Sequence, residues 1–443
     1  MGRGRRVVSG GCGTRCPPDR PREFRACLRA GTAVTGAAVV RQGSGTETSA
    51  ALFAELNAAL DLELGGAVEL RHRLHAAPCL SGAEQPAADQ LAGFISRPVQ
   101  PVASTGFYLR TGPEDGPSVA VRTELDGLPL VEENDVSFAS ANGAMHACGH
   151  DVHQAAFAAF VRAAAAVELP FALTAIAQPR EETYPSGALD IINDGLLARE
   201  QVASVLAVHV HPGIPEGSVA TGSGAINAAA DEFEIVVRGR GGHGAYPHSS
   251  VDPVPVAARI CLAAYDLIRS TVSPVSPAAL TVGELKTGTA SNVIPDQALI
   301  RGTLRTMDKH EQSLLHTALR RCAEHTAQAA GATAEVSITV GEPVLRNDAV
   351  LSSRAERWLA QQGLGGAEPL RSCGADDFSF FTEAVPGVMA FLGVRSPSPA
   401  PQSPLHSATF LPPDTAVGEC ARTLVALYVG AVEELLAQQP AGG

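Results

Sequence analysis

The order of apolar segments along the chain constrains its fold more than any other feature. Leucines at helical spacing predict a helix over 49–77, which Pro78 ends. Strand-like and helix-like segments then alternate: a strand over 119–124, a helix over 146–167, a strand over 171–178, a helix over 186–197 and a strand over 205–211. This alternation predicts an α/β fold, with a mixed, mostly parallel sheet flanked on both faces by helices.

Residues 231–340 follow a different order. Strands and helices are expected over 233–237, 253–268, 279–285, 298–304, 311–330 and 334–340, in the order β-α-β-β-α-β. This order is typical of a ferredoxin-like domain. The first pattern resumes with a helix over 349–361, a strand over 388–393 and a helix over 415–436. We therefore expect a larger domain in two parts, 49–228 and 342–443, with a compact domain inserted at 229–341.

The N-terminal segment, 1–48, has a composition of its own. Its first 41 residues carry nine arginines against two acidic residues, whereas the whole chain has a formal net charge of -13. Arg5 and Arg6 are compatible with a twin-arginine export signal, but no compact apolar segment follows them. We expect a disordered extension, or a start codon assigned too early, rather than an export signal.

Charge and cysteine content exclude several classes of protein. A net charge of -13 argues against nucleic acid or an anionic membrane as partner, because such surfaces need clustered Lys and Arg. No apolar run reaches the ~18 residues of a membrane span. The nine cysteines are scattered and form no CxxC pair, which is typical of reduced thiols. The sequence predicts a soluble, cytoplasmic protein.

Five potential metal ligands occur within eight residues at the start of the second predicted helix. They are His146, Cys148, His150, Asp151 and His153. A thiolate and an imidazole two residues apart in a turn can converge on one cation. Alternatively, Asp151 caps the helix and the histidines form local hydrogen bonds.

Two further clusters follow the next two predicted strands, and α/β sheets place their ligand sites at this carboxyl edge. Glu181 and Glu182 come after one strand, and His209 ends the other. Adjacent carboxylates after a buried strand are costly unless a cation neutralises them, and one of the two could then serve as a base. An exposed acidic turn and a buried structural histidine are the alternatives. His406, ahead of the last helix, adds a fourth candidate.

Eight motifs occur in one order from residue 70 onward. They are RHRLHAAP at 71–78, VRTELDGLP at 121–129, MHACGHD at 145–151, QPREE at 178–182, GGHGA at 241–245, NVIPD at 292–296, GTLR at 302–305 and DDFS at 376–379. Together they resemble the amidohydrolase branch of the zinc aminoacylase and glutamate carboxypeptidase superfamily. That branch contains hippurate hydrolases and indoleacetyl-amino-acid hydrolases.

The resemblance implies a role for each candidate ligand. Cys148 would bridge two cations, and the remaining ligands would be His150, Glu182, His209 and His406. Glu181 would be the general base. One or two divalent cations per subunit are expected; zinc suits the Cys and His ligands best, and Mn, Co or Ni are also compatible with this mixed donor set.

The inserted domain resembles the lid and dimerisation domain of the family. His243, Asn292 and Arg305 would then contact the carbonyl or carboxylate of the substrate, in the same subunit or in its neighbour. The resemblance therefore implies a homodimer joined through residues 229–341.

We expect hydrolysis of small N-acyl amino acids by a metal-activated water. A metallo-carboxypeptidase or dipeptidase of the same superfamily is the nearest alternative. A hydrolase with Cys148 as nucleophile and His150 or His153 as base would leave the paired glutamates without a role. A non-catalytic metal-binding protein would need neither Glu181 nor Asn292.

The chain departs from the family pattern at several positions. Glu124 replaces an aspartate, which puts the orientation of a metal-binding histidine in question. Arg180 replaces an alanine, the segment from Glu182 to Gly187 is one residue longer, and Cys79 replaces a glutamate. All five implied ligands and Glu181 are nevertheless present.

Overall fold

The computed structural model describes residues 45–395 and 402–439. The expected extension over 1–48 therefore lies outside the described residues, except for its last four positions. The first described helix is α2 (Gly45–Ala76), which ends before Pro78. Leu56, Leu60 and Leu70 on this helix are completely buried, so the leucine spacing was a correct sign of a packed helix.

Seven strands form the larger sheet. Their order is β1-β2-β4-β3-β5-β15-β6, and β4, β3, β5 and β15 run parallel, with antiparallel strands at both edges. The bounds are β1 (Gln100–Val102), β2 (Gly106–Thr111), β3 (Ser118–Glu124), β4 (Ala172–Gln178), β5 (Val202–His211), β6 (Val219–Ala220) and β15 (Gly387–Gly393). The mixed, mostly parallel sheet is thus confirmed.

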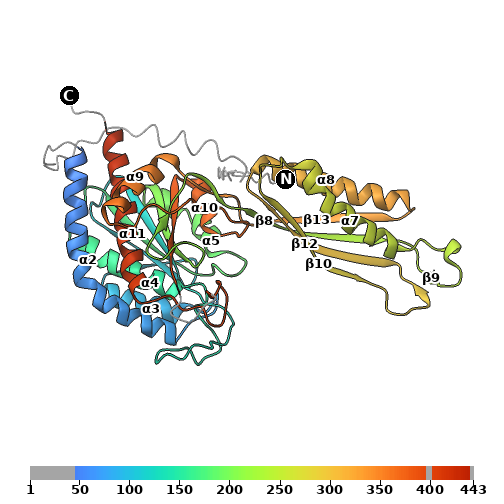
Figure 1. The fold of residues 1–443 in the computed structure, drawn as a ribbon, viewed down its shortest axis with the longest axis horizontal. Coiled ribbons are helices and arrows are strands. Elements are labelled where there is room, and N and C mark those ends of the chain that lie inside the picture. The colour runs from blue at the N-terminus through green and yellow to red at the C-terminus, as the bar shows by residue number, and fades with distance from the viewer. Residues whose placement is uncertain (1–44, 396–401, 440–443) are drawn as a thin grey trace, which may run out of the picture. The chain divides into compact units, whose positions relative to one another are not determined.

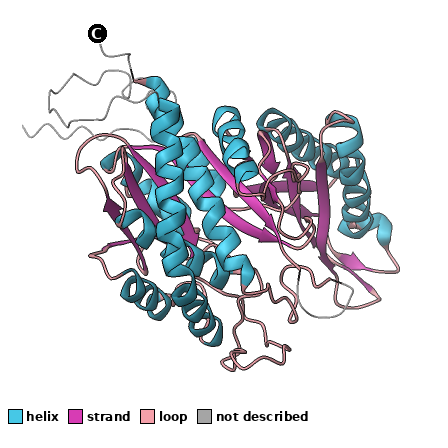
Figure 2. Ribbon diagram, turned by 60° about the vertical axis from the view of Figure 1, so that its left-hand side comes forward, coloured by secondary structure: helices cyan, strands magenta, loops and turns pink. Residues whose placement is uncertain are grey.

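Helices cover both faces of this sheet (Figures 1 and 2). One face packs against α2, α3 (Gln85–Ile95), α4 (His150–Ala165), α9 (Ala349–Gln361) and α11 (Thr415–Gln438). The other packs against α5 (Gly187–Asn193), α6 (Leu196–Arg199) and α10 (Phe378–Ala384). Side chains of β3 alternate between these layers: Val119 and Val121 belong to the first core and Ala120 to the second. A strand buried on both faces needs the continuous apolar run seen here.

The inserted unit comprises the segments from β8 to β13. They are β8 (Ala229–Arg238), α7 (Pro253–Thr271), β10 (Ala278–Thr287), β12 (Gln297–Thr306), α8 (Lys309–Ala329) and β13 (Thr333–Val340). The strands form an antiparallel sheet in the order β10-β12-β8-β13, and a separate core packs α7 and α8 on one face. This is the expected ferredoxin-like arrangement.

The two segments that connect the inserted unit to the rest of the chain lie together. β7 (Gly224–Asn227) leads into β8, and β13 leads to β14 (Leu345–Asn347), which pairs with β7. The Ala230 N–H also donates to the carbonyl oxygen of Glu342. We call this end of the four-stranded sheet the crossover end. A short pair, β9 (Gly242–His243) with β11 (Val293–Ile294), lies beyond the opposite end, because β8 leads into β9 and β11 leads into β12.

Several elements differ from the expectation. The helix expected over 186–197 is two helices, α5 and α6, because Gly195 between them adopts φ +75°. Helix α3 and strands β1 and β2 were not predicted; they are short edge elements without a long apolar period. No helix in the described residues is both long and apolar enough to cross a membrane.

Candidate metal centre

The candidate ligands gather at the carboxyl ends of the parallel strands, where open α/β sheets bind their ligands. Cys148 and His150 lie at the start of α4, and Glu182 follows β4. His209 lies near the end of β5, and His406 lies in the segment between β15 and α11. Residues that are far apart in sequence are therefore brought to one edge by the order of the strands.

Cys148 is at the centre of the cluster. Its Sγ lies 3.4 Å from Nε2 of His209 and 3.4 Å from Nε2 of His406. His406 Nε2 lies 3.5 Å from Oε1 of Glu182. In a tetrahedral zinc site, bonds of about 2.3 Å to sulfur and about 2.0–2.1 Å to nitrogen or oxygen place neighbouring ligand atoms roughly 3.4–3.6 Å apart. The spacing of these side chains therefore fits ligands that share a cation.

Hydrogen bonds at Nδ1 direct Nε2 of two histidines toward the cluster. His150 Nδ1 donates to the carbonyl oxygen of Asp126 at 2.9 Å, and His209 Nδ1 donates to that of Val210 at 2.7 Å. The lone pair of each neutral ring must then be on Nε2. His150 Nε2 lies 3.9 Å from Glu181 and 4.0 Å from Glu182. Both rings are fixed in the tautomer that a metal ligand requires.

Buried polar atoms in the cluster lack hydrogen-bond partners among the described residues. These atoms include Nε2 of His150 and Oε1 of Glu182. Burying a polar atom without a partner costs about 1–3 kcal/mol, and more when the group is charged. A divalent cation would satisfy both atoms at once, so the residues present fit a metal.

The charge balance of the cluster also favours a cation. Burial alone would lower the pKa of His150, but surrounding carboxylates, chiefly Asp126 and Glu124, outweigh this effect and raise it to about 10. Burial and neighbouring carboxylates raise the pKa of Glu181 well above its usual range. Both shifts have the same physical origin, an excess of buried negative charge, which a divalent cation would neutralise.

His153, one of the five candidates in the segment from 146 to 153, is not free to bind a metal. Its Nδ1 donates to Glu124 at 3.1 Å and its Nε2 accepts from the Val210 N–H at 2.9 Å. Val210 follows His209 directly, so the Glu124–His153 pair fixes the backbone beside that ligand. The longer side chain of Glu124 therefore orients a supporting histidine rather than a ligand.

The other two candidates in this segment also lie outside the cluster. Asp151 accepts from Arg71 and from His75, each at 3.0 Å. It does not cap α4, whose first turn begins after Gly149 without a side-chain cap, so the helix-cap alternative is wrong. His146 is buried, and neither of its ring nitrogens has a hydrogen-bond partner in the described chain.

Unusual backbone conformations occur beside the ligands. His406 has φ +63°, a region that non-glycine residues rarely adopt, and its N–H donates to Ala147 O at 2.8 Å. Gly149 has φ +86°, and a Cβ at this position would lie 2.4 Å from a methyl group of Val210. Glycine is therefore required between Cys148 and His150.

Asp377 supports the loop that carries the paired glutamates, a role that the sequence did not reveal. It accepts hydrogen bonds from Arg122 at 2.5 Å, Gln178 at 2.7 Å and Ser186 at 2.7 Å. Gln178 ends β4 and Ser186 precedes α5, so both ends of the loop are bound to one carboxylate. The DDFS motif was the available signal, but it did not specify this function.

The three residues expected to bind substrate do not converge within one inserted unit. His243 pairs with Val293 in the β9–β11 pair, and the Gly244 N–H donates to Asn292 O at 2.8 Å. Arg305 lies near the other end of β12, where its backbone pairs with Ala230 at the crossover end. His243 and Asn292 are thus neighbours, and Arg305 is separated from them by most of the strand.

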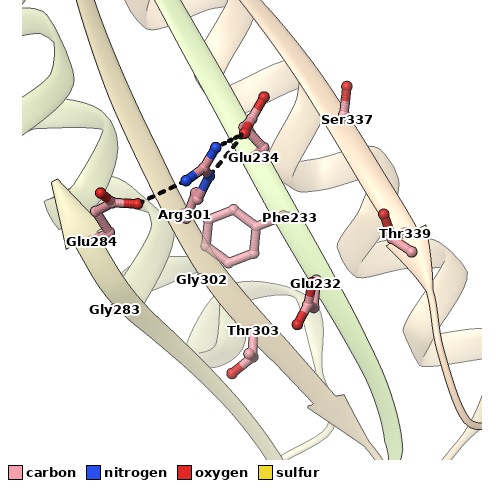
Figure 3. Close-up of a pocket in the computed structure, with 10 residues that line it drawn as sticks. All are labelled: Glu232, Phe233, Glu234, Gly283, Glu284, Arg301, Gly302, Thr303, Ser337 and Thr339. Carbon is pink, nitrogen blue, oxygen red and sulfur yellow. Dashed lines mark hydrogen bonds and ion pairs between the residues drawn. The ribbon is translucent and has the colours of Figure 1, made fainter. Parts of the chain in front are cut away.

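A cavity of about 250 Å³ opens onto the cluster. Its wall consists of Cys148, Glu181, Glu182, His209, His211, Asn227, Leu370, Ser372, Gly374, Ala375, Asp376, Phe391, Leu405 and His406. A larger hollow of about 450 Å³ lies on the open face of the four-stranded sheet (Figure 3). There Arg301 is paired with Glu234 at 2.8 Å and Glu284 at 3.2 Å, and the hollow contains none of the possible metal clusters of the described chain. The smaller cavity is the candidate active site.

Comparison with known proteins gives a consistent result. Residues 120–428 match the family described as Peptidase family M20/M25/M40. An N-acetylcysteine deacetylase of Bacillus subtilis is 32% identical over 74% of this chain and 88% of its own length. The thermostable carboxypeptidase 2 of Saccharolobus solfataricus is 32% identical over 77% of this chain and 89% of its own. The solved structure of the Bacillus subtilis YXEP protein, a dinuclear metal binding peptidase from the M20 family, is 28% identical with a TM-score of 0.73, covering 84% of this chain and 99% of that one.

Proposed function

Because this chain belongs to peptidase family M20/M25/M40 and is therefore a hydrolase of amide bonds, we propose that it removes the acyl group from N-acyl amino acids. The observation that carries the proposal is the convergence of a thiol, three imidazoles and a glutamate on one cavity, with a second glutamate beside them. The deacetylase relative supports this substrate class, and the carboxypeptidase relative makes peptides the second class to test.

The metal would be held by Cys148, His150, Glu182, His209 and His406, as one or two divalent cations. Zinc suits the sulfur and imidazole donors best. When bound, the metal would supply a polarised amide carbonyl and a water of lowered pKa.

Glu181 is assigned the proton transfer. Its carboxylate would accept the proton of the attacking water and deliver it to the nitrogen of the departing amine. Burial and the nearby carboxylate of Asp376 raise the pKa of Glu181, which makes it a stronger base than an exposed glutamate. Glu182, its neighbour, has a buried Oε1 facing His406 at 3.5 Å and is therefore assigned to the metal.

The alternative with Cys148 as nucleophile is disfavoured by the environment of the thiol. Burial and the carboxylates of Glu182 and Glu181 raise the pKa of Cys148 well above its usual value. A catalytic cysteine needs the opposite, a positive environment that stabilises its thiolate. Cys148 is better suited to a metal ligand, because a cation stabilises the thiolate directly.

The main test is a hydrolysis assay of metal-loaded protein with paired substrates. N-acetyl, N-butyryl and N-benzoyl derivatives of one amino acid are compared with dipeptides that carry the same C-terminal residue. We expect release of free amino acid from the acyl derivatives at kcat/KM values above those of the dipeptides. Faster cleavage of every dipeptide would favour the carboxypeptidase function instead.

We also propose a homodimer in which each inserted unit completes the active site of its partner. Asn227 lines the cavity and is two residues before β8, so the crossover end lies at the site. Strand β8 has ten residues, so the β9–β11 pair with His243 lies roughly 30 Å beyond that end. Arg305, at the crossover end, is positioned to attract the substrate carboxylate, whereas His243 is better placed to serve a neighbouring subunit.

A candidate surface for this contact lies on the same unit. Strand β10 is at the edge of the four-stranded sheet, and Leu285 on this strand is 47% exposed. On the adjoining helix α7, Leu262 is 72% exposed and Tyr265 is 50% exposed. An open strand edge beside exposed apolar side chains supports pairing with a second copy.

Complementation tests the shared site. His243→Ala and Glu181→Gln variants, each inactive alone, are mixed under conditions that allow subunit exchange. In a shared site the mixed dimer regains one complete site, so about a quarter of wild-type activity is expected after random exchange. An inactive mixture that sedimentation shows to contain mixed dimers would place His243 in the site of its own subunit.

A reduced compartment is the proposed location. The six cysteines in the described residues are all free thiols. This is typical of the cytoplasm, where glutathione keeps thiols reduced.

A further inference from the structure

His211 is a polar residue of the active-site cavity that neither the metal site nor the proton transfer uses. It is the last residue of β5 and lines the cavity. Side chains two residues apart on a strand point to the same face, so His211 shares the face of the ligand His209. Its ring lies edge-on to that of Phe391, with a centroid distance of 6.2 Å.

A backbone hydrogen bond determines which nitrogen of His211 carries the proton. The Gly213 N–H donates to His211 Nδ1 at 3.1 Å. Nδ1 must therefore be unprotonated, and the proton of the neutral ring is on Nε2. The described residues form no hydrogen bond or ion pair with Nε2. His211 thus offers a neutral N–H donor in the cavity wall.

The charge of the cavity indicates which half of the substrate lies against this wall. Glu181, Glu182 and Asp376 line the cavity, and no Lys or Arg is among its lining residues. These carboxylates would repel the carboxylate of the amino acid. The acyl chain is therefore the half that enters, and a volume of about 250 Å³ suits a small one.

The rest of the wall is largely apolar. Leu370, Phe391 and Leu405 provide most of the hydrocarbon surface. A hydrocarbon acyl chain would satisfy these residues but would leave the N–H of His211 without a partner once water is displaced. An acyl chain with a neutral oxygen would satisfy both, whereas a second carboxylate would again be repelled.

We propose that His211 determines acyl specificity by donating a hydrogen bond to a neutral oxygen in the acyl chain. The enzyme then prefers N-acyl amino acids whose acyl group carries a ketone, hydroxyl or amide oxygen over those with a hydrocarbon acyl group. The inference rests on the proposed function and names the substrate class more closely. Leaving a buried donor unpaired lowers affinity, so a preference of about 10-fold is expected from this bond.

The test uses pairs of acyl groups that differ only in the acceptor. N-(4-oxopentanoyl) is compared with N-(4-methylpentanoyl), and N-(3-oxobutanoyl) with N-(3-methylbutanoyl), on the same amino acid. The variants are His211→Phe, which removes the donor and keeps a ring, and His211→Gln, which keeps an N–H donor. His325→Phe, at an exposed position of α8, is the control. The ratio of wild type to variant cancels differences in the intrinsic reactivity of the amides.

For the better of the two pairs, His211→Phe should lower kcat/KM for the ketone about 10-fold and leave that of the methyl analogue unchanged. His211→Gln should retain part of the preference, and His325→Phe should retain all of it. Metal content should be equal in every variant, which shows that His209 is undisturbed. Equal losses on both members of each pair, or no wild-type preference relative to His211→Phe, would overturn the role of His211 and leave the proposed function intact. Metal-loaded protein that hydrolyses none of these amides would overturn both.

Discussion

Glu181 and Glu182 are adjacent, but their replacement by glutamine should have different consequences. Glu181→Gln removes the proposed base and keeps the size of the side chain. General base catalysis typically contributes about 100-fold to 10,000-fold, which corresponds to roughly 2.7–5.5 kcal/mol in the activation barrier. We expect kcat to fall by this factor while KM and metal content change little.

Glu182→Gln should instead weaken metal binding. Its buried Oε1 lies 3.5 Å from His406 and 4.0 Å from His150, so an amide there replaces a charged ligand at the centre of the cluster. Changes to groups that merely support a ligand typically cost 10-fold to 100-fold in affinity, and the loss of a ligand should cost at least about 100-fold.

The assay measures both quantities on each variant: metal affinity by competition with a chelator, and kcat and KM at saturating metal. Glu55→Gln, at an exposed position of α2, is the control and should resemble wild type. Loss of metal from the Glu181 variant with full occupancy in the Glu182 variant would mean that the two roles are reversed. A change confined to KM in the Glu181 variant would make it a binding residue.

Three further predictions follow from the same contacts. Cys148→Ser should lower metal affinity by at least about 10-fold with little loss of structure by circular dichroism, because an alcohol is a poor substitute for a thiolate; unchanged metal content would make the thiol a bystander. His153→Phe should lower metal affinity about 10-fold to 100-fold through the backbone beside His209, measured by chelator competition, and an unchanged affinity would contradict a supporting role. Burial lowers the pKa of His75, but Asp151 and Glu132 outweigh this effect and raise it to about 9 from 6.5, so its protonated ring should add about 3 kcal/mol to the free energy of unfolding below pH 6.5. That contribution is lost as pH rises from 6.5 to 9, so urea unfolding of wild type and His75→Gln should differ most at pH 6 and least at pH 10; a constant difference would show that His75 does not titrate in this range.

The sequence identified the elements of the fold that have a long apolar pattern. Helices α2, α9 and α11 and the parallel strands were expected close to their observed bounds, because each buries a regular set of side chains. Strands β6, β7 and β14 have two to four residues each and were not predicted. Such strands depend on a partner that is distant in sequence, which no local pattern encodes.

The candidate site shows the same division. The carboxyl-edge rule placed Cys148, Glu182 and His209 near one another correctly, because it depends only on strand direction. It could not show that His153 is occupied by Glu124 and Val210, since these hydrogen bonds join three separate elements. Nor could it reveal the separation of Arg305 from His243, which follows from the pairing of β12 with β8.

Removal and restoration of the metal test the central claim most directly. The protein is treated with a strong chelator, its metal content is measured by elemental analysis, and hydrolysis of an N-acyl amino acid is followed before and after zinc or manganese is added. We predict that activity disappears with the metal and returns in proportion to the metal bound, because the cavity brings five ligand side chains together beside Glu181. Full activity in protein that elemental analysis finds to be free of metal would contradict the mechanism.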